Sequence, residues 1–456
     1  MPTAIEYFKL LPKTNCKDCG QPTCLAFAMQ LANQKAKIED CPHVDSGAKD
    51  TIAEASAPPV KTITVGTGNS KIPMGGETVL FRHERRFINP IAYALTISDG
   101  LSSDELTKRI EYIKSLSFDR IGMIFKVDMV SIKDDSKDPA RFKAAVEQVM
   151  GLWDQPFVLE SDDTATIKNV LSICKARVPL VYGASAANID EMLAIAKENK
   201  VPLGIKATST EEAVTLAEKA KASGYDEIIL DLGAKGIKDI LEQHTIARRA
   251  AIKKKFKPLG YPLMNRAGSG EYAVMTSVIS TLKYGSLVIL DDLKNYEALP
   301  LFTLRQNIYT DPQVPIQVKQ GIYPIGNPDE HSPIMFTTNF SLTYFTVRAD
   351  IEKSKVPVWL QIVNTDGLSV LTAFAAGKFD ADHIKTAFDE SGILEKSDGV
   401  VIIPGLVTRI SGKLEEAIGR KVIVGTTESK NIPKHLKQVT SGCDHDHQLG
   451  QRLTEW

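Results

Sequence analysis

The chain has 456 residues with 55 basic and 56 acidic side chains, which leave a net charge of −1. This balance argues against a nucleic-acid binder, because such proteins carry a basic excess. The sequence holds no apolar run of about 18 residues, the length from which a membrane-spanning helix is predicted. Its N-terminus also lacks the basic start and apolar stretch of a secretory signal peptide. We therefore expect a cytoplasmic protein of two or three domains that contacts neither nucleic acid nor membrane.

Four of the six cysteines lie within the first 41 residues. Cys16, Cys19, Cys24 and Cys41 have the spacing C-x2-C-x4-C-x16-C. Soft sulfur ligands at this density favour an iron–sulfur cluster or zinc. The step Cys41-Pro42 resembles the one that often closes a ferredoxin cluster-binding run, which favours [4Fe-4S]. Zinc stays open as an alternative, although its usual second C-x2-C pair is missing, and a disulfide framework is the least favoured.

The first 57 residues are predicted to form a small iron–sulfur cluster domain with a linker. Apolar side chains between Ile5 and Leu11 predict one short helix, and a second is predicted to begin at Cys24. The amide groups at the start of the second helix would point at an anionic cluster. Small residues before the pair Pro58-Pro59 predict a linker that ends this unit.

Eight apolar runs alternate with eight helical patterns in the middle of the chain. The predicted strands are Ile91–Ile97, Arg120–Val127, Pro156–Glu160, Pro179–Gly183, Pro202–Lys206, Glu227–Leu232, Tyr261–Asn265 and Leu287–Leu290. The predicted helices are Asp104–Leu116, Pro139–Trp153, Asp163–Ala176, Asp190–Asn199, Thr210–Ser223, Ile237–Ile252, Glu271–Tyr284 and Tyr296–Tyr309. Helix starts carry the expected cap residues Ser103, Ser209 and Ser269. The pattern predicts an α/β fold with a TIM (β/α)8 barrel, which we place at residues 58–325.

Polar residues follow the predicted barrel strands, where the active sites of barrels lie. They are Asp99, Asp128, Glu160, Ser185, Lys206, Asp231, Asn265 and Asp291. In a functional interpretation, Lys206, Asp231 and Asn265 form a small-molecule site. In the alternative, which we favour, such residues cap strand ends and helices as in any barrel. No set of metal-binding histidines is apparent, since His244 is predicted to lie within a helix.

Residues 326–456 are predicted to form a smaller, doubly wound α/β domain. Its predicted strands are Phe336–Val347, Val356–Gly367, Val400–Gly405 and Val422–Val424, and its predicted helices include Leu368–Ala376, Ala381–Ser391 and Ser411–Ile418. Ligands of such sheets bind beyond the carboxyl ends of the strands. The sequence therefore predicts a ligand site at Asn364–Ala373 and Pro404–Gly405.

Small and polar residues cluster at these two strand ends. Gly367 would allow close backbone approach, while Ser369 and Thr372 offer hydroxyl groups. Further polar groups are expected on the first strand, at Asn339, Thr343 and Thr346. The alternative is ordinary helix capping by Thr365 or Asp366. Neither the G-x-G-x-x-G nor the G-x-x-x-x-G-K-[ST] nucleotide fingerprint is present.

These motifs together resemble one known family over essentially the full length of the chain. The segments that carry the resemblance are Cys16-Lys-Asp-Cys19-Gly-Gln-Pro-Thr-Cys24-Leu-Ala-Phe, Cys41-Pro, the central barrel, and Thr365-Asp-Gly-Leu-Ser-Val-Leu-Thr-Ala-Phe. They look like the large (gamma) subunits of corrinoid iron–sulfur proteins of the reductive acetyl-CoA pathway. The cysteine motif occurs in other redox proteins as well, so its combination with the barrel and the C-terminal segment is what is specific.

The resemblance implies two cofactors. A [4Fe-4S] cluster would be held by the four N-terminal cysteines, and a cobalamin by the C-terminal domain. The implied corrinoid contacts are Asn339, Thr346, Gly367, Ser369, Val370, Leu371, Thr372, Ala373 and Gly405. No catalytic side chain is implied, because the chemistry would take place on the corrinoid cobalt.

The resemblance also implies an activity and a set of partners. The chain would be a methyltransferase component that accepts a methyl group from methyltetrahydrofolate through a separate methyltransferase. It would pass the methyl to the nickel site of acetyl-CoA synthase, in carbon dioxide fixation. The cluster would return Co(II) to Co(I) with an electron from a ferredoxin-type donor. A small (delta) subunit would complete a heterodimer.

The histidines are consistent with a base-off cobalamin that lacks a protein imidazole ligand. Corrinoid domains with such a ligand often carry D-x-H-x-x-G, and the nearest text here, from Asp329 to Ile334, lacks the glycine. It also precedes the first predicted strand of the domain. His383 has no aspartate two residues before it. Cys443, His445 and His447 form a short tract that we interpret as incidental ligands near the chain terminus.

Two alternatives from other functional classes stay open. The chain could be a pterin-dependent barrel methyltransferase with an iron–sulfur relay. It could instead be an electron-transfer or scaffold subunit. An absorption spectrum with corrinoid bands over an iron–sulfur shoulder would favour the methyl carrier. A spectrum with the shoulder alone would leave both alternatives open.

Overall fold

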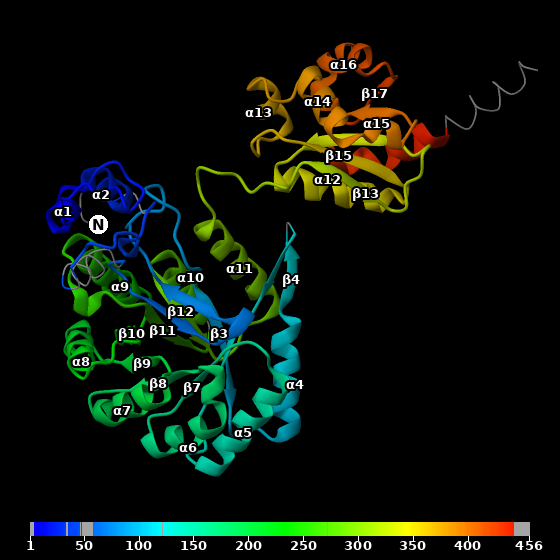
Figure 1. Ribbon diagram of the computed structural model, residues 1–456. Helices are drawn as coiled ribbons and strands as arrows, with labels where there is room; N and C mark the ends of the chain where they lie inside the picture. Colours follow the sequence, from blue (N-terminus) through cyan, green and yellow to red (C-terminus); the bar gives the residue numbers. More distant parts are fainter. Residues whose placement is uncertain are drawn as a thin grey trace, which may run out of the picture. The chain divides into compact units, whose positions relative to one another are not determined.

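The computed structural model describes residues 4–32, 35–45, 47, 58–120, 122–270 and 272–441 (Figure 1). Within them lie a small N-terminal part, a closed barrel and a C-terminal sheet. Residues 119–124 and those from Thr310 onward form one compact unit, and the rest of the chain forms another. No helix among the described residues is long and apolar enough to cross a membrane. Cys443, His445 and His447 lie outside the described residues.

The N-terminal part consists of two short helices and the loops that carry the cysteines. Helices α1 (Ala4–Leu10) and α2 (Cys24–Ala32) confirm the two predicted helices, and a 3-10 turn, η1 (Ile38–Asp40), precedes Cys41. Their small core is built around Tyr7, Phe27 and Leu31. Cys24 and Cys41 belong to this core, so two of the four thiols are buried within it.

Eight parallel strands close into a barrel, as predicted, with helices on its outside (Figure 1). The strands are β3 (Ala92–Ser98), β6 (Met129–Lys133), β7 (Phe157–Glu160), β8 (Leu180–Ala184), β9 (Leu203–Lys206), β10 (Ile228–Asp231), β11 (Leu263–Gly268) and β12 (Gly285–Leu290). The helices are α4 (Ser103–Ser115), α5 (Pro139–Leu152), α6 (Thr164–Cys174), α7 (Ile189–Asn199), α8 (Thr210–Ala222), α9 (Ile237–Lys253), α10 (Ala273–Leu282) and α11 (Asn295–Tyr309). Apolar strands buried on both faces explain why the sequence signal was continuous rather than alternating.

The helix caps agree with the sequence only in part. Ser209 accepts a hydrogen bond from the Glu212 amide and caps α8, as predicted. For α4 the cap is Ser102 rather than Ser103, and Glu105 completes a capping box with it. The predicted cap Ser269 is wrong, because α10 begins at Ala273 after Tyr272.

The predicted strand Arg120–Val127 is also wrong as a barrel strand. Strands β4 (Ser117–Arg120) and β5 (Met123–Lys126) instead form a separate two-stranded sheet. The barrel position is filled by β6, whose first four residues are fully buried, whereas β5 leaves Ile124 70% exposed. Both segments are apolar in sequence, so the sequence did not show which one joins the barrel.

One end of the barrel interior is sealed by a hairpin that the sequence did not reveal. Strands β1 (Thr62–Val65) and β2 (Ile72–Gly75) pair antiparallel. Ile63, Val65 and Met74 are completely buried against apolar side chains inside the barrel, such as Met129 and Leu287. Each such side chain contributes on the order of 1.5–3 kcal/mol by leaving water. The hairpin therefore closes the amino-terminal end of the barrel.

The C-terminal sheet has the strand order β13-β15-β14-β16-β17. Its strands are β13 (Gly321–Ile325), β14 (Ile334–Thr338), β15 (Val358–Val363), β16 (Val401–Ile403) and β17 (Val422–Val424). Its helices are α12 (Ser341–Ser354), α13 (Val370–Ala375), α14 (Ala381–Ser391), α15 (Ile393–Lys396), α16 (Ser411–Ile418) and a helix at 432–441. Strand β13 was not predicted, and it pairs antiparallel with β15. The sheet therefore includes residues that precede the predicted start of this domain at residue 326. The other strands are parallel and form the expected α/β arrangement.

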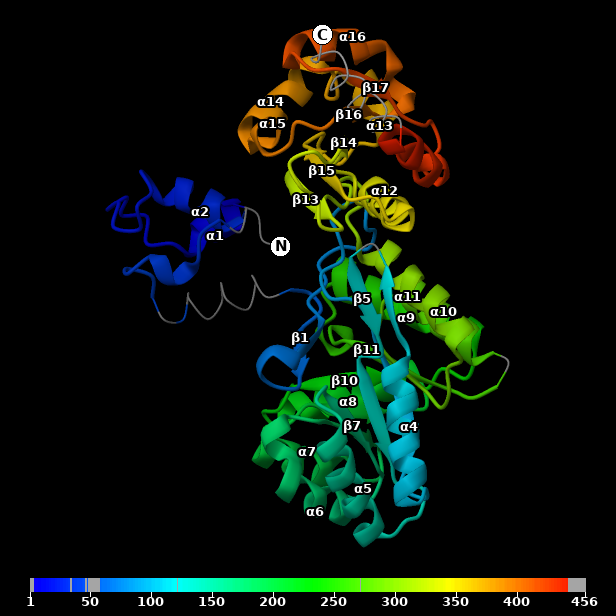
Figure 2. The same ribbon diagram turned by 90° about the vertical axis from the view of Figure 1, so that its right-hand side faces the viewer.

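Helices cover both faces of this sheet (Figure 2). One face packs Phe336 and Val401 against α13, α14 and α16, and the other packs Met335 and Leu360 against α12 and the helix at 432–441. The predicted strand Phe336–Val347 is too long, because α12 begins at Ser341. Thr343 and Thr346 consequently lie on a helix and not on a strand.

Candidate functional sites

The C-terminal sheet has a topological switch point between β14 and β16. The chain leaves β14 toward β15 on one side, and it leaves β16 toward β17 on the other. Diverging connections open a crevice at the carboxyl ends of two neighbouring strands, which is where α/β sheets bind ligands. The sheet topology therefore predicts a ligand site next to Thr338 and Ile403.

A cavity of about 290 Å³ lies at this point. Its apolar wall includes Phe336, Val370, Ile403, Leu406 and Ile432. Residues that carry a hydroxyl group line it from three segments: Thr337, Thr343, Thr346, Thr426, Thr427 and Ser429. A mostly apolar cavity with a few polar groups is typical of small-molecule and cofactor sites.

Thr337 is the cavity residue whose polar group is left unsatisfied. Its side chain is 1% exposed, and its Oγ1 has no hydrogen-bond partner among the described residues. An unpaired buried hydroxyl is costly, by roughly 1–3 kcal/mol. A ligand with a polar group in the cavity would relieve that cost.

The predicted corrinoid contacts are distributed unevenly around the cavity. Thr346 and Val370 line it. Gly405 lies between two lining residues, and a Cβ there would approach Gly425 O to 2.6 Å, so glycine is required where the loops after β16 and β17 meet. Leu371 and Thr372 are exposed at the start of α13, with Ser369 half-buried before them, whereas Ala373 is packed in the core under α13.

Asn339 is buried and fully hydrogen-bonded within the protein. Its Oδ1 accepts from the Thr365 amide, the Thr365 hydroxyl and the Gly367 amide at 3.0, 3.0 and 2.9 Å. Its Nδ2 donates to Gln317 Oε1 at 3.1 Å and to Asn364 Oδ1 at 3.0 Å. The side chain thus connects the end of β14 with the loop that follows β15.

The loop after β15 contains two consecutive left-handed residues, Asp366 at φ 55° and Gly367 at φ 75°. A Cβ on Gly367 would lie 2.8 Å from Gln317 Cγ and 3.0 Å from Pro315 Cβ. Glycine is therefore required here both by conformation and by the protein's own packing. This packing explains the glycine without a ligand, and the expected contact of Gly367 with a ligand stays a prediction.

Sequence reasoning missed four of the six hydroxyl-bearing cavity residues: Thr337, Thr426, Thr427 and Ser429. The last three follow β17 directly, so the strand-end rule applied to that strand would have found them. Thr337 lies inside β14, and only the three-dimensional arrangement shows which face of the strand it occupies.

The N-terminal part places all four predicted cluster ligands in one small unit. Each of these cysteines has a free thiol. Cys24 and Cys41 are 7% and 3% exposed, Cys19 is half-buried against the same core, and Cys16 is exposed. Four free thiols from two loops and a helix start form a donor set that fits an iron–sulfur cluster.

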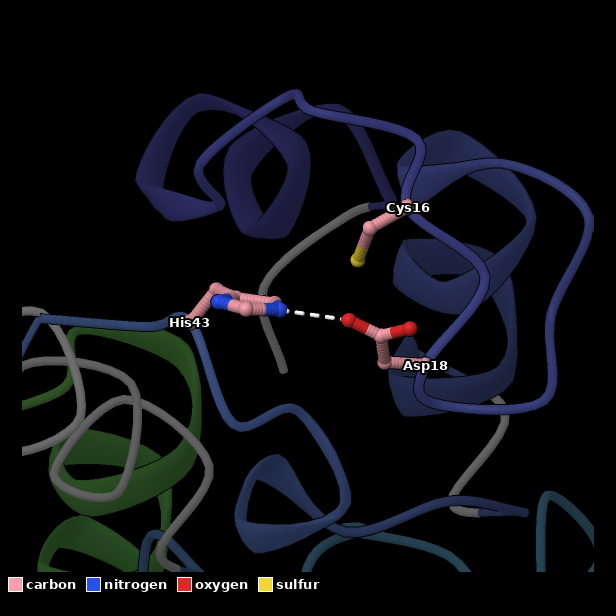
Figure 3. A group of neighbouring side chains, drawn as sticks. All are labelled: Cys16, Asp18 and His43. Carbon is pink, nitrogen blue, oxygen red and sulfur yellow. Dashed lines mark hydrogen bonds and ion pairs between the residues drawn. The ribbon is translucent and has the colours of Figure 1, made fainter.

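Figure 3 shows the group that the structure brings together around Cys16. The sulfur of Cys16, a carboxylate oxygen of Asp18 and a ring nitrogen of His43 lie within 4.8 Å of one another. His43 Nε2 lies 2.5 Å from Asp18 Oδ2. The hydrogen bond from His43, and to a smaller extent one from Cys16, hold the pKa of Asp18 below its usual value. This pair links the loop of the first two cysteines to the residue that follows Cys41-Pro42.

The start of α2 differs from its expected role. The Cys24 amide donates to Asn15 Oδ1 at 2.8 Å, and the Ala26 amide donates to Thr23 Oγ1 at 3.0 Å. Two amides of the first turn are therefore taken by side-chain caps instead of pointing freely at a cluster. Asn15 also donates its own backbone N–H to Cys24 Sγ at 3.4 Å.

The carboxyl end of the barrel interior is polar but internally paired. Arg266 donates to Glu160 at 2.7 Å and also pairs with Asp291. Tyr182 donates to Asp231 at 2.5 Å. Burial raises the pKa of Glu160, opposed by Arg266, and burial likewise raises the pKa of Asp231. These inward-facing groups satisfy one another rather than leave donors and acceptors for a ligand.

The suggested trio of Lys206, Asp231 and Asn265 does not form one site. Met264 and Arg266 point into the barrel, so Asn265 between them points outward. It accepts a hydrogen bond from Ser280 of α10 at 2.5 Å. Lys206 is exposed at the end of β9.

Other predicted strand-end residues have structural roles. Asp128 precedes β6, so it lies at the opposite end of the barrel, where it accepts from the Tyr93 amide and pairs with Arg305. Asp99 accepts from the amides of Asp135 and Ser136. The Ser185 amide donates to Asn188. These contacts support the capping interpretation.

The fold and its sites define a three-part protein, with a four-cysteine unit, a closed barrel and an α/β domain that has a cavity at its switch point. A family model described as "CO dehydrogenase/acetyl-CoA synthase delta subunit" matches residues 62–436. A second, described as "Putative Fe-S cluster", matches residues 11–43.

Curated relatives match almost the whole chain. The corrinoid/iron-sulfur protein large subunit of Moorella thermoacetica is 43% identical over 94% of this chain and 97% of its own. The acetyl-CoA decarbonylase/synthase complex subunit gamma of Methanocaldococcus jannaschii is 34% identical over 95% of this chain and 96% of its own. The chain belongs to this family of corrinoid/iron-sulfur protein large subunits and decarbonylase/synthase gamma subunits. The barrel is also similar to the dihydropteroate synthase of Vibrio fischeri, with 11% identity, a TM-score of 0.37 and coverage of 48% of this chain and 93% of that one.

Proposed function

We propose that this chain is a corrinoid methyl carrier with an iron–sulfur cluster for reductive activation. It would accept a methyl group from methyltetrahydrofolate through a separate methyltransferase and deliver it to the nickel site of acetyl-CoA synthase. The observation that carries the proposal is the cavity at the switch point of the C-terminal sheet, in a chain whose N-terminal unit holds four free cysteines. The full-length likeness to a corrinoid/iron-sulfur protein large subunit supports it.

The corrinoid would be held by the cavity and the surface beside it. A bound corrinoid supplies a cobalt atom that is a strong nucleophile as Co(I). Thr337 and Thr346 would bond its polar groups inside the cavity, and Val370 would contact its apolar parts. Ser369, Leu371 and Thr372 would present the outer surface. Asn339 and Gly367 would shape the loop between them from behind, since their polar groups are used within the protein.

The cobalt would lack a protein histidine ligand. His331 precedes the start of β14 and is not among the residues that line the cavity. Its imidazole is exposed and lies 2.9 Å from Asp398. His383 is likewise exposed and is bonded to Asp380 at 2.8 Å. We expect His331→Ala and His383→Ala to leave the cobalt spectrum unchanged.

The N-terminal unit would hold a [4Fe-4S] cluster on Cys16, Cys19, Cys24 and Cys41. The cluster would supply the electron that returns Co(II) to Co(I). A ferredoxin-type protein would reduce the cluster. A small (delta) subunit would join the chain in a heterodimer, as the large-subunit name of the Moorella relative suggests.

An absorption spectrum of the anaerobically purified chain, alone and with its small subunit, tests the proposal. Corrinoid bands over an iron–sulfur shoulder are expected. A shoulder without corrinoid in both preparations would favour an electron-transfer or scaffold subunit. Cys19→Ala should remove the cluster signal and the recovery from Co(II), while methyl transfer from an already methylated cofactor should persist because it needs no electron. Survival of the full iron content in Cys19→Ala would contradict the ligand assignment.

The barrel would serve as a scaffold and not as a pterin methyltransferase. The paired arrangement of Arg266, Glu160 and Asp291 supports this role. Titration of the chain with methyltetrahydrofolate tests it. Tight binding that Asp231→Ala abolishes would favour the alternative function.

A further inference from the structure

Asn15 and Cys24 make a reciprocal pair of hydrogen bonds across nine residues of the N-terminal loop. The Asn15 backbone N–H donates to Cys24 Sγ at 3.4 Å. The Asn15 side-chain Oδ1 accepts from the Cys24 backbone N–H at 2.8 Å. The sulfur of an expected cluster ligand is thus itself a hydrogen-bond acceptor, and the same residue supplies both contacts.

The conformation of Asn15 explains why this residue type occupies the position. Its φ is 51°, in the left-handed region that asparagine adopts more readily than other residues with a side chain. That conformation turns the backbone N–H toward Cys24, and the side-chain bond fixes it there. Cys24 is only 7% exposed, so water competes little for its sulfur.

A hydrogen bond to a ligand sulfur changes the energy of the cluster that the sulfur holds. One-electron reduction makes a cluster and its thiolates more negative. A donor at the sulfur stabilises the reduced form more than the oxidised form, so it raises the reduction potential. Hydrogen bonds to the sulfurs are among the features by which proteins set cluster potentials.

We infer that Asn15 is a positioning residue that fixes the sulfur of Cys24 and raises the reduction potential of the iron–sulfur cluster through its backbone N–H. This inference rests on the proposed function, because it requires a cluster on the four cysteines. It adds a specific determinant of how readily that cluster accepts an electron.

The competing explanation is that Asn15 merely caps α2. Thr23 offers a matched comparison, since its Oγ1 accepts from the Ala26 amide at 3.0 Å in the same helical turn. Thr23 and Asn15 each supply one neutral side-chain cap to α2. Among the described residues, Thr23 makes no hydrogen bond to a cysteine sulfur, whereas Asn15 makes one.

The experiment compares the full-length chain with Asn15→Ala, Asn15→Gly and Thr23→Ala, all purified anaerobically. Iron content is measured first, and the midpoint potential is then taken from a redox titration followed by electron paramagnetic resonance. We expect Asn15→Ala to lower the potential, with a change of up to about tenfold in the one-electron equilibrium constant, or about 59 mV. Asn15→Gly keeps the left-handed backbone available and should lower it less. Thr23→Ala should leave it at the wild-type value.

The outcomes separate this inference from the proposed function. A wild-type chain without an iron–sulfur signal would contradict the proposed function itself. A wild-type cluster, together with Asn15 variants that match Thr23→Ala in potential, would overturn this inference alone. If Asn15→Ala takes up no iron, the midpoint potential of Asn15→Gly is compared with that of Thr23→Ala in the same way. Loss of iron from both Asn15 variants but not from Thr23→Ala supports the positioning role, and equal loss from all three overturns it.

Discussion

The barrel and the C-terminal sheet both present the carboxyl ends of parallel strands, yet they differ in what those ends contain. In the barrel, Arg266 is paired with Glu160 and Asp291, and Tyr182 is bonded to Asp231. In the C-terminal sheet the strand ends surround a cavity of about 290 Å³, and the hydroxyl of Thr337 has no partner among the described residues. Polar side chains at strand ends therefore do not by themselves mark a site. A site is marked by polar groups that the protein leaves unpaired around open space.

The strongest test of this comparison is to fill the cavity. Thr346 lines it from an exposed position on α12, so Thr346→Trp should leave the fold intact while the indole occupies the space. We expect bound corrinoid to fall below about a tenth of the wild-type amount, which corresponds to at least about 1.4 kcal/mol. The measurement is the cobalt content after anaerobic gel filtration.

Thr386→Trp is the matched control for this change. Thr386 lies on α14, and like Thr346 it is exposed and donates its hydroxyl to the carbonyl four residues earlier. It does not line the cavity. Equal cobalt contents in the two variants would contradict the assignment of the cavity.

The second test breaks the pairing in the barrel. Arg266→Met would leave Glu160 and Asp291 without their cation in a largely buried position. We expect the barrel to lose roughly 2–4 kcal/mol of unfolding free energy, measured by urea denaturation, while the corrinoid content stays unchanged. Arg348→Met removes the exposed pair with Glu352 and should cost less than about 1 kcal/mol. A loss of corrinoid in Arg266→Met would contradict the purely structural role of the barrel mouth.

The third test uses the pH dependence of the barrel. His244 is completely buried, with Nδ1 bonded to Lys283 O, and burial lowers its pKa to about 4. Because this pKa lies below that of the unfolded chain, the unfolded state binds more protons between these values. Stability from this group is thus present above about pH 6.5 and is lost as the pH falls toward 4.

We expect His244 to account for about 2 kcal/mol of lost unfolding free energy between pH 7 and pH 5. Urea denaturation at the two values measures the loss, and His244→Gln should remove this part of it. An unchanged pH slope in His244→Gln would show that other groups are responsible.

The smallest expected effect concerns the outer surface of the proposed corrinoid site. Thr372 is exposed, and its hydroxyl lies 3.0 Å from that of Ser369. Thr372→Ala should weaken corrinoid retention by about one hydrogen bond, roughly 0.5–1.5 kcal/mol. The rate of cobalt loss during dialysis measures this effect, with Thr386→Ala as the control. Retention equal to that of the control would remove Thr372 from the site.

Much of the fold could be predicted because it depends on local patterns. The apolar runs and helix periods predicted seven of the eight barrel strands, and Ala381–Ser391 and Ser411–Ile418 match α14 and α16 in both bounds. The strand at 120–127 failed because two apolar segments competed for one barrel position. The β1–β2 hairpin was missed because its burial depends on barrel residues that lie more than fifty positions away, such as Met129.

The candidate site was harder to predict because side-chain direction depends on strand register and on distant partners. Asn265 looked like a site residue, but its position between the inward-facing Met264 and Arg266 turns it outward. Asn339 was expected to contact a ligand. Its hydrogen-bond partners in the structure are protein groups from the segments around Gln317 and Thr365. The corrinoid contacts and the cluster ligands stay predictions, whereas the cysteine spacing alone was enough to indicate the iron–sulfur unit that the family comparison supports.

The N-terminal loop combines three left-handed residues with side chains, Lys13, Asn15 and Lys17, with a core of nine buried side chains among the described residues. A unit of about 40 residues with so small a core usually needs a metal, disulfides or association with another chain to remain folded. On the proposed function, loading the cluster and completing this unit become a single event during maturation. A partly loaded preparation would then contain chains with a folded N-terminal unit and chains with an unfolded one, and the fraction of this unit that resists protease would report the extent of cofactor assembly.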